Sequence, residues 1–361
     1  MRMKQTSEGK AKIYTDGKVF YNPEMRTLRD ISVLFLRAVS TKKKRVLDAT
    51  AATGIRAIRY ALEAGAKDVT ALDINDSAAK IAQKNMKLNH LKFKVLNEGL
   101  QVLAGTSRDK FEIIDLDPFG SPAPYIHDAM KLSWDGTVLM VTATDTAVLC
   151  GAHDAACIKV YNAKPLHNEM CKEVGIRILL SYITRVASGF NFGVVPLLSI
   201  SDRHYMRVFV RLEFGASKAI FSVKTTGLGA FCRKCYSFRF ASGVAPLMPD
   251  RCDECGERLE PFGPLWLGNL QDKELIKKML GIGEMQMARE IYDELDTLML
   301  YSVPKITEAL GFGSVSRYKV VERLKRMGRR ATMTQFNKDG IKTDAGPKEV
   351  FRVVDELKEK K

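Results

Sequence analysis

The feature that most constrains the fold is an alternation of short apolar segments with amphipathic ones between residues 45 and 144. Apolar runs of strand length end at Asp48 and Asp73, and three more cover residues 93–97, 111–117 and 136–144. The segments that follow Asp48 and Asp73 have the apolar spacing of helices. Short strands that alternate with helices predict an α/β fold, a mainly parallel sheet with helices on both faces. Such sheets bind ligands at the carboxyl ends of their strands.

Carboxylates occupy the ends of the first four predicted strands: Asp48, Asp73, Glu98 and Asp117. Small residues between Asp48 and Gly54 let the backbone come close to a ligand before a helix begins. Asp73 follows Gly54 by nineteen residues. A carboxylate there can accept hydrogen bonds from both ribose hydroxyls, although it could instead cap the next helix. Glu98 and Gly99 close the third strand, where an adenine could be contacted. The absence of GxGxxG argues against a dinucleotide cofactor.

The fourth predicted strand ends in the turn Asp117-Pro118-Phe119-Gly120. Pro118 removes an N–H and leaves carbonyl oxygens free as acceptors, while Phe119 offers a flat face to a base. A carboxylate that accepts the protons of an aryl amine turns its lone pair towards a methyl donor. Asp115 and Asp117 flank Leu116 at the end of this strand, and we expect them to point to opposite faces, so that only one faces the substrate. In isolation such a turn could be purely structural, with Phe119 in the core.

The series of strand-end carboxylates resembles that of class I S-adenosylmethionine-dependent methyltransferases, which have a Rossmann-like sheet. The DPFG turn resembles that of members which modify exocyclic amino groups of nucleobases. The segment that precedes the first strand supplies a second aromatic residue, Phe20, and places Arg29 near the start of a predicted helix. Arg29 could hold the methionine carboxylate of the cofactor. Arg56 could do the same or contact RNA, although either arginine could simply be a solvated surface residue.

Four of the seven cysteines form two close pairs, CRKC and CDEC, separated by sixteen residues: Cys232, Cys235, Cys252 and Cys255. Each pair can chelate one side of a tetrahedral ion, so the four thiolates predict a closed, structural Zn²⁺ site. Redox-active disulfides are the alternative. The metal would hold residues 236–251 as a loop that could touch RNA.

Basic charge is concentrated near the C-terminus. The chain carries a formal charge of +15, of which residues 305–342 contribute +7, from ten Lys or Arg against three acids. Clustered positive charge favours a polyanionic partner, with a solvated helix face as the alternative. Residues 273–300 predict helix, and residues 303–344 predict helix, turn, helix and a basic hairpin, the order of a winged-helix-like module.

After the fifth strand, residues 194–215 predict an antiparallel strand pair that completes the sheet, followed by a break at residues 215–218. No apolar run is long enough to cross a membrane, and the N-terminal segment is too polar for a secretory signal. We therefore expect a cytoplasmic protein without a membrane partner.

Six motifs spread over almost the whole chain carry a more specific resemblance: VFYNPEMRTLRD, DATAATGIR, DLDPFGSP, VTATDTAVLCGAH, GPLWLG and FNKDGIKTDA. Together they resemble the tRNA (guanine-N2)-dimethyltransferase family of archaeal type. This resemblance implies an S-adenosylmethionine-binding catalytic domain at residues 1–217, a zinc segment at 218–270 and a smaller α+β, winged-helix-like tRNA-binding domain at 271–361. The implied activity is one or two methyl transfers to N2 of a guanosine in tRNA, usually at position 26. No obligate protein partner is inferred.

The resemblance also assigns roles to residues. The implied cofactor contacts are Arg29, Arg56, Asp73, Glu98 and Gly99. Asp48 and Gly54, in the turn after the first predicted strand, are further candidate cofactor contacts. Asp117 would be the catalytic acceptor, and Phe20 and Phe119 would sandwich the guanine. Glu98-Gly99 replaces an Asp-Ala pair of relatives, and a zinc site looks like a feature of only some members. Two alternatives remain open: a non-catalytic zinc- and RNA-binding protein, and an adenine-N6 methyltransferase that acts on DNA or rRNA.

Overall fold

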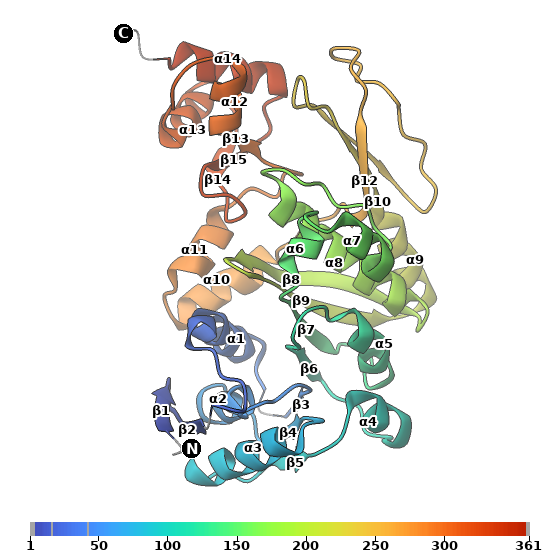
Figure 1. Cartoon of the computed structure of the whole chain (residues 1–361), viewed down its shortest axis with the longest axis vertical. Coiled ribbons are helices and arrows are strands. Elements are labelled where there is room, and N and C mark those ends of the chain that lie inside the picture. The colour runs from blue at the N-terminus through green and yellow to red at the C-terminus, as the bar shows by residue number, and fades with distance from the viewer. Residues whose placement is uncertain (1–3, 16, 42, 359–361) are drawn as a thin grey trace.

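A seven-stranded mixed sheet forms the centre of the protein (Figure 1). The computed structural model describes residues 4–15, 17–41 and 43–358, so the outermost ends of the predicted domains lie outside the described residues. The strand order is β5-β4-β3-β6-β7-β9-β8. The five parallel strands are β3 (Arg45–Asp48), β4 (Asp68–Leu72), β5 (Lys94–Leu96), β6 (Ile113–Leu116) and β7 (Val138–Ala143). The predicted α/β fold is thereby confirmed.

The predicted antiparallel pair completes one edge of the sheet, as β8 (Phe192–Asp202) and β9 (Tyr205–Phe214). β9 runs antiparallel to β7 and lies between β7 and β8. The tight connection at residues 203–204 therefore lies at the same edge as the carboxyl ends of the parallel strands, because β8 runs parallel to β7.

Helices cover both faces of the sheet, since the strands alternate apolar side chains between two separate cores. One core is formed with α4 (Leu100–Thr106), α5 (Ala123–Lys131), α6 (Thr146–Leu149), α7 (Asp154–Tyr161) and α8 (Cys171–Ser188). The opposite core contains α1 (Arg26–Val39) and α2 (Ile55–Glu63), with α3 (Asp76–Leu88) beside α2. An N-terminal hairpin that the sequence analysis did not predict, β1 (Lys4–Glu8) and β2 (Ala11–Thr15), packs on α2 and α3, and the short η1 (Pro23–Met25) leads into α1.

The break predicted at residues 215–218 is wrong, because only Gly215 interrupts the chain there. Its φ of 141° is accessible to glycine and strained for other residues. Helix α9 (Ala216–Thr225) begins at once and packs on β8. The cysteine segment then forms a three-stranded antiparallel sheet in the order β11-β10-β12, from β10 (Thr226–Phe231), β11 (Phe238–Ser242) and β12 (Glu260–Trp266).

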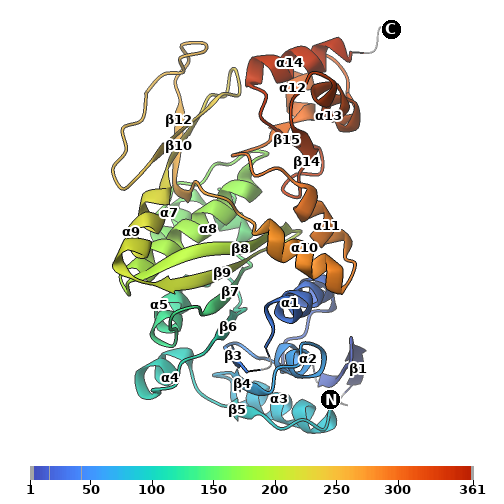
Figure 2. The ribbon, with the colours of Figure 1, turned by 180° about the vertical axis from the view of Figure 1, so that it is seen from behind.

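The C-terminal third divides into two parts. Helix α10 (Lys273–Ile282) packs on α1, and α11 (Gln286–Asp293) packs on α10 (Figure 2). Both contribute to the core of the central sheet, so the predicted boundary at residue 271 precedes a segment that packs with the catalytic domain. A separate core begins at Val303. It is built from β13 (Tyr301–Ser302), α12 (Val303–Ala309), α13 (Arg317–Arg326), β14 (Ala331–Met333), β15 (Gly340–Thr343) and α14 (Pro347–Glu356).

A buried ion network joins this C-terminal module to the central sheet. Lys342 on β15 places its Nζ 3.1 Å from Oε1 of Glu173 on α8 and 3.8 Å from Oε1 of Glu294. Arg177, one turn after Glu173, also donates to Glu173 Oε1, at 2.9 Å and 3.0 Å. All four side chains are almost fully removed from solvent.

None of the helices in the described part of the chain is long and apolar enough to cross a membrane.

Candidate active site at the carboxyl edge of the sheet

The loops that follow the parallel strands meet at one edge of the sheet. Asp73, after β4, accepts hydrogen bonds from the backbone N–H of Ala52, at 2.8 Å, and of Asn75, at 2.9 Å. It therefore ties the loop after β3 to its own loop and does not simply cap α3, a role that the Asn75 side chain fills. Its half-buried carboxylate keeps acceptor capacity for a ligand, because each carboxylate oxygen has two lone pairs.

The turn after β3 depends on Gly54 and Asp48. Gly54 has a φ of 76°, and a Cβ there would lie 3.1 Å from that of Ala82, so both strain and contact favour glycine. Asp48 has no exposed surface, and its Oδ2 accepts from the N–H of Ala57 at 3.1 Å. Burial raises the pKa of Asp48 to about 7, and the charge of Asp115 adds to this. The structure places Asp48 beneath the turn as its support; a direct cofactor contact stays a prediction.

The loop after β5 lies beside the Asp73 loop. Asn97, which the sequence analysis did not single out, donates to the carbonyls of Asp73, at 3.0 Å, and Ile74, at 3.1 Å. Glu98 is half-buried, and the buried Gly99 begins α4. A Cβ at Gly99 would come within 2.5 Å of the Gln101 side chain. The structure thus brings Asp73 and the Glu98-Gly99 pair to neighbouring loops.

The DPFG turn presents its aromatic ring to solvent. Phe119 is 72% exposed and Phe20 is 45% exposed, so Phe119 does not fill the core. The two ring centroids lie 4.4 Å apart, with the rings inclined at 77° to each other. The structure therefore brings the two predicted rings together in edge-to-face contact, and their role as a pocket for guanine stays a prediction. A base can enter between them only if they separate and become parallel.

Asp117 is bound by Arg56. Its Oδ2 lies 2.8 Å from Nε and 2.6 Å from NH2 of Arg56, while NH1 of Arg56 lies 3.8 Å from Asp115. Both aspartates thus lie on one face of the strand, so the expectation that they point to opposite faces is wrong: residues two apart in a strand share a face. Asp115 is fully buried, whereas the Asp117 side chain is 15% exposed, so burial and not strand direction distinguishes the two carboxylates.

The environment of Asp117 keeps it ionised. Burial alone would raise its pKa, but the charges of Arg56 and Arg207 outweigh burial and lower the pKa below the ordinary value of 3.8. The Thr142 hydroxyl also helps to lower this pKa, although Oδ1, the second oxygen of Asp117, is buried and makes no hydrogen bond of ordinary geometry among the described residues. Asp117 is therefore an anion with an unused acceptor. Arg56, predicted to contact the cofactor or RNA, instead has Asp117 as its partner in this structure.

A buried polar network that the sequence analysis missed supports this pair. Asp115 accepts hydrogen bonds from the hydroxyl of Tyr60 and, at 2.8 Å, from NH2 of Arg207 on β9. Arg207 has no exposed surface and also donates to Thr142 on β7. The one available signal was an arginine among the apolar residues of the strand YMRVFVRLEF. A buried charge in a central strand requires a partner, but sequence does not name it.

Arg29 forms a second buried ion pair, with Glu8. It donates to Glu8 on β1 at 2.7 and 2.5 Å and to the carbonyl of Asn22 at 2.9 Å. Arg59 donates to the same Glu8 at 2.8 Å. These contacts hold the N-terminal hairpin and the segment that carries Phe20. The predicted contact of Arg29 with a cofactor carboxylate is not tested by this geometry and stays a prediction.

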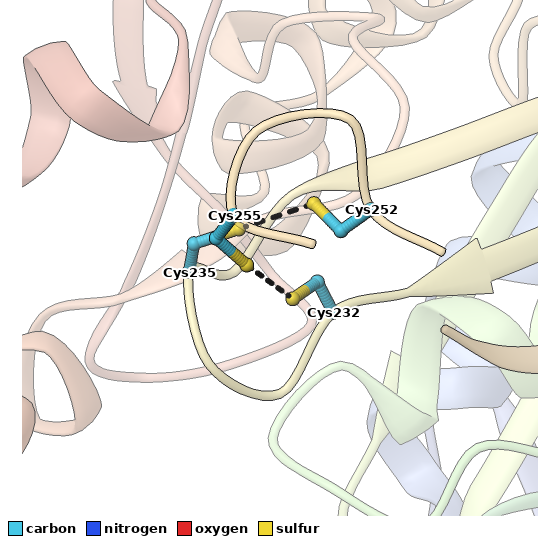
Figure 3. Close-up of side chains that lie close together, drawn as sticks. All are labelled: Cys232, Cys235, Cys252 and Cys255. Carbon is cyan, nitrogen blue, oxygen red and sulfur yellow. Dashed lines mark hydrogen bonds between the residues drawn. The ribbon is translucent and has the colours of Figure 1, made fainter. Parts of the chain in front are cut away.

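The four cysteines of the CRKC and CDEC pairs converge (Figure 3). Their sulfur atoms all lie within 4.8 Å of one another, and the Sγ atoms are 3.5 Å apart for Cys232 and Cys255 and 3.4 Å apart for Cys235 and Cys252. Four thiolates at about 2.3 Å from a tetrahedral Zn²⁺ would be about 3.8 Å apart. A disulfide requires about 2.05 Å. The cluster therefore fits a metal centre better than two disulfides.

The doubly covered sheet, with carboxylates on adjoining loops at the carboxyl ends of its strands, has the architecture of a class I methyltransferase fold. Comparison with known proteins narrows this class. Residues 2–355 match the model of the N2,N2-dimethylguanosine tRNA methyltransferase family. The chain belongs to this family.

Similar proteins span nearly the same length. The tRNA (guanine(26)-N(2))-dimethyltransferase of Methanobrevibacter smithii is 35% identical over 96% of this chain and 93% of its own. That of Pyrococcus furiosus is 36% identical over 97% and 98%. A solved structure of Trm1 from Pyrococcus horikoshii in complex with S-adenosyl-L-methionine superimposes with a TM-score of 0.89 at 33% identity, and covers 97% of this chain and 99% of that one.

Proposed function

We propose that this protein transfers one or two methyl groups from S-adenosylmethionine to the exocyclic N2 of guanosine 26 in tRNA. One observation carries the chemistry: an ionised Asp117 with an unused oxygen lies beside the exposed ring of Phe119. The names of the relatives support this function over a non-catalytic RNA-binding protein and over an adenine methyltransferase. A tRNA substrate also supports the predicted cytoplasmic location.

The cofactor, S-adenosylmethionine, would supply an electrophilic methyl group on its sulfonium. The residues present fit its binding. Asp73 has acceptor capacity for the two ribose hydroxyls, and the adjoining Glu98 and Gly99 are suited to the adenine. Gly54 lets the turn after β3 approach the ligand. Arg29 and Arg56 remain proposed carboxylate contacts. Each of them would have to share its guanidinium with the carboxylate that it already binds.

The guanine must leave its stack for N2 to reach Asp117. Phe20 and Phe119 would open to hold it on both faces. The free Oδ1 of Asp117 would accept one N2–H, which favours pyramidalisation of the amine and turns its lone pair towards the methyl group. Because Arg56 keeps Asp117 ionised and its pKa low, the main role of Asp117 is to orient the amine and not to hold its proton. The proton released after transfer is strongly acidic and can pass through Asp117 to water. A second transfer requires the monomethyl amine to present its remaining N–H to the same oxygen.

The C-terminal module would bind tRNA as a winged-helix-like domain. Its elements occur in the order strand, helix, helix, strand, strand, helix, and helix α13 carries much of the +7 segment. Tyr318 on α13 is 64% exposed, with the guanidinium of Arg317 5.2 Å from its ring centroid. Several arginines there form exposed ion pairs, as Arg323 does with Glu356. Exposed pairs are weak, so phosphates can replace the carboxylates. From the packing, we place the module at residues 301–358 and keep α10 and α11 with the catalytic domain.

We propose that the four-cysteine cluster binds structural Zn²⁺. Purified protein is expected to hold about one zinc per chain by mass spectrometry of metals, because four thiolates leave no open position. Cys252→Ser should lose most of the metal and expose the loop at residues 236–251 to limited proteolysis. The matched variant Cys171→Ser, outside the cluster, should keep both properties. Metal-free wild-type protein, or equal metal content in the two variants, would contradict this assignment.

The function is tested by incubation of the protein with isotopically labelled S-adenosylmethionine and unmodified tRNA, followed by nucleoside chromatography. Label is expected in N2-methylguanosine and N2,N2-dimethylguanosine. A tRNA with adenosine in place of guanosine 26 is the control and should accept no label. Label in N6-methyladenosine, or tight tRNA binding without any transfer, would support one of the two alternatives instead.

A further inference from the structure

The motif VTATDTAVLCGAH contains a second carboxylate at the same edge of the sheet, Asp145, to which no role has been given. It follows β7 directly, as the DPFG turn follows β6, and these two strands are parallel neighbours. The two loops remain bonded beyond the sheet. Gly120 donates its N–H to Thr144 Oγ1 at 2.7 Å, and the N–H of Thr144 donates to the Gly120 carbonyl at 3.0 Å. Asp145 is therefore held beside the turn that carries Asp117 and Phe119.

The Asp145 carboxylate is not used to cap a helix. It stands at the start of the short helix α6, yet among the described residues its side chain accepts no capping hydrogen bond. Instead, the hydroxyl of Tyr161 lies 2.9 and 3.0 Å from its two oxygens. Tyr161 is fully buried and accepts from Ser121 Oγ at 2.8 Å. Since Ser121 follows the DPFG turn, this chain of hydrogen bonds fixes the carboxylate relative to the catalytic loop.

The carboxylate keeps unused acceptor capacity. Burial raises the pKa of Asp145 above its ordinary value of 3.8, while hydrogen bonds from the hydroxyls of Tyr161 and Ser121 and from its own backbone N–H lower it. When ionised, the half-buried carboxylate has about four lone-pair sites, more than these donors occupy. An ionised carboxylate in this position can accept from a substrate N–H but cannot donate. The Watson–Crick edge of guanine carries adjacent donors, N1–H and N2–H, whereas N1 of adenine is an acceptor.

We propose that Asp145 is a specificity-determining residue that recognises the target base as guanine by accepting its N1–H, while Asp117 accepts N2–H. This inference rests on the proposed function and deepens it, because the DPFG turn alone does not choose the purine. Adenine, or any purine without a proton on N1, would place its N1 lone pair against a carboxylate. Sites built to bond a substrate N–H discriminate strongly against analogues that lack it, because the polar group of the site is left unpaired.

The test compares two tRNAs, with guanosine or with 2-aminopurine ribonucleoside at the target position. Both bases carry the exocyclic N2 amine, but N1 of 2-aminopurine has no proton. Wild-type protein is expected to prefer guanosine in kcat/KM by about 10²-fold or more. Asp145→Asn replaces the acceptor by a carboxamide that can donate to N1 of 2-aminopurine, so this preference should fall to less than about one tenth of the wild-type ratio. Asp154→Asn, an exposed carboxylate on α7, is the matched control and should keep the wild-type ratio.

The ratio separates recognition from a structural role. If Asp145→Asn lowers both rates equally and leaves the ratio unchanged, the proposal is overturned. If Asp145→Asn does not fold, as judged by circular dichroism, Tyr161→Phe decides: it releases the carboxylate and should reduce the ratio several-fold, and an unchanged ratio overturns the proposal. Failure of wild-type protein to methylate the guanosine tRNA would instead refute the proposed function.

Discussion

Replacement of Asp117 by alanine is expected to lower kcat for N2 methylation by about 10³-fold, the range typical of a lost acid–base group. The variant loses the ionised carboxylate of the DPFG turn, to which the acceptance of N2–H is assigned. The fold should survive, because Arg56 keeps Asp115 at 3.8 Å as a counter-charge. The Kd for S-adenosylmethionine, measured by calorimetry, should change by less than about 3-fold, because binding is assigned to Asp73 and the loop at Glu98.

Two further variants define the role of Asp117. Asp117→Asn keeps the size of the side chain and an acceptor oxygen, so a smaller loss than in the alanine variant would identify hydrogen-bonded orientation as a main contribution. Asp109→Ala removes an exposed carboxylate that precedes β6 and should retain wild-type activity. The assigned role would be refuted by an alanine variant with kcat within about 10-fold of wild type, or by one that loses cofactor affinity but keeps turnover.

Replacement of Lys342 by methionine is expected to lower the free energy of unfolding by about 3–5 kcal/mol. Methionine retains most of the volume but leaves Glu173 with Arg177 alone and Glu294 without its nearby cation. Removal of one partner from a buried charge network leaves a desolvated charge uncompensated, which costs far more than the loss of a surface pair. Urea denaturation followed by circular dichroism measures the difference.

The control is Lys305→Met, which removes an exposed lysine paired with Glu308 and should leave the denaturation midpoint unchanged. A loss of less than about 1 kcal/mol in Lys342→Met would show that water reaches the network and compensates the acids. Because Lys342 lies on β15 and Glu173 on α8, the variant is also expected to loosen the C-terminal module and weaken tRNA binding more than cofactor binding.

The sequence predicted those parts of the site that depend on the position of a residue along a strand or on the spacing between nearby residues. The strand-end positions of Asp73, Glu98 and Asp117 and the four cysteines were found from period and spacing, and the structure brings each group to neighbouring loops. The sequence pattern wrongly predicted a break at residues 215–218. The chain turns at Gly215 alone, in a backbone conformation that favours glycine, and then continues directly as α9. The sequence also did not show that α10 packs on α1 and that α11 joins the same core, since an amphipathic helix does not specify which apolar surface covers it.

Sequence by itself therefore determined the fold class, the family motifs, the metal-type cysteine spacing and the aromatic turn, because each is set by residues near one another in the chain. Only the tertiary structure decided how the charges pair. It joined Arg56 to Asp117, Arg207 to Asp115, Arg29 to Glu8 and Lys342 to Glu173. All four pairs connect residues that are far apart in the chain and belong to different elements or loops, and any arginine or lysine could satisfy any carboxylate as far as sequence shows. Coulomb attraction depends on the distance between charges in space, which the sequence does not give. A buried charge is stable only where the fold brings an opposite charge within a few ångströms, so the fold determines the partner.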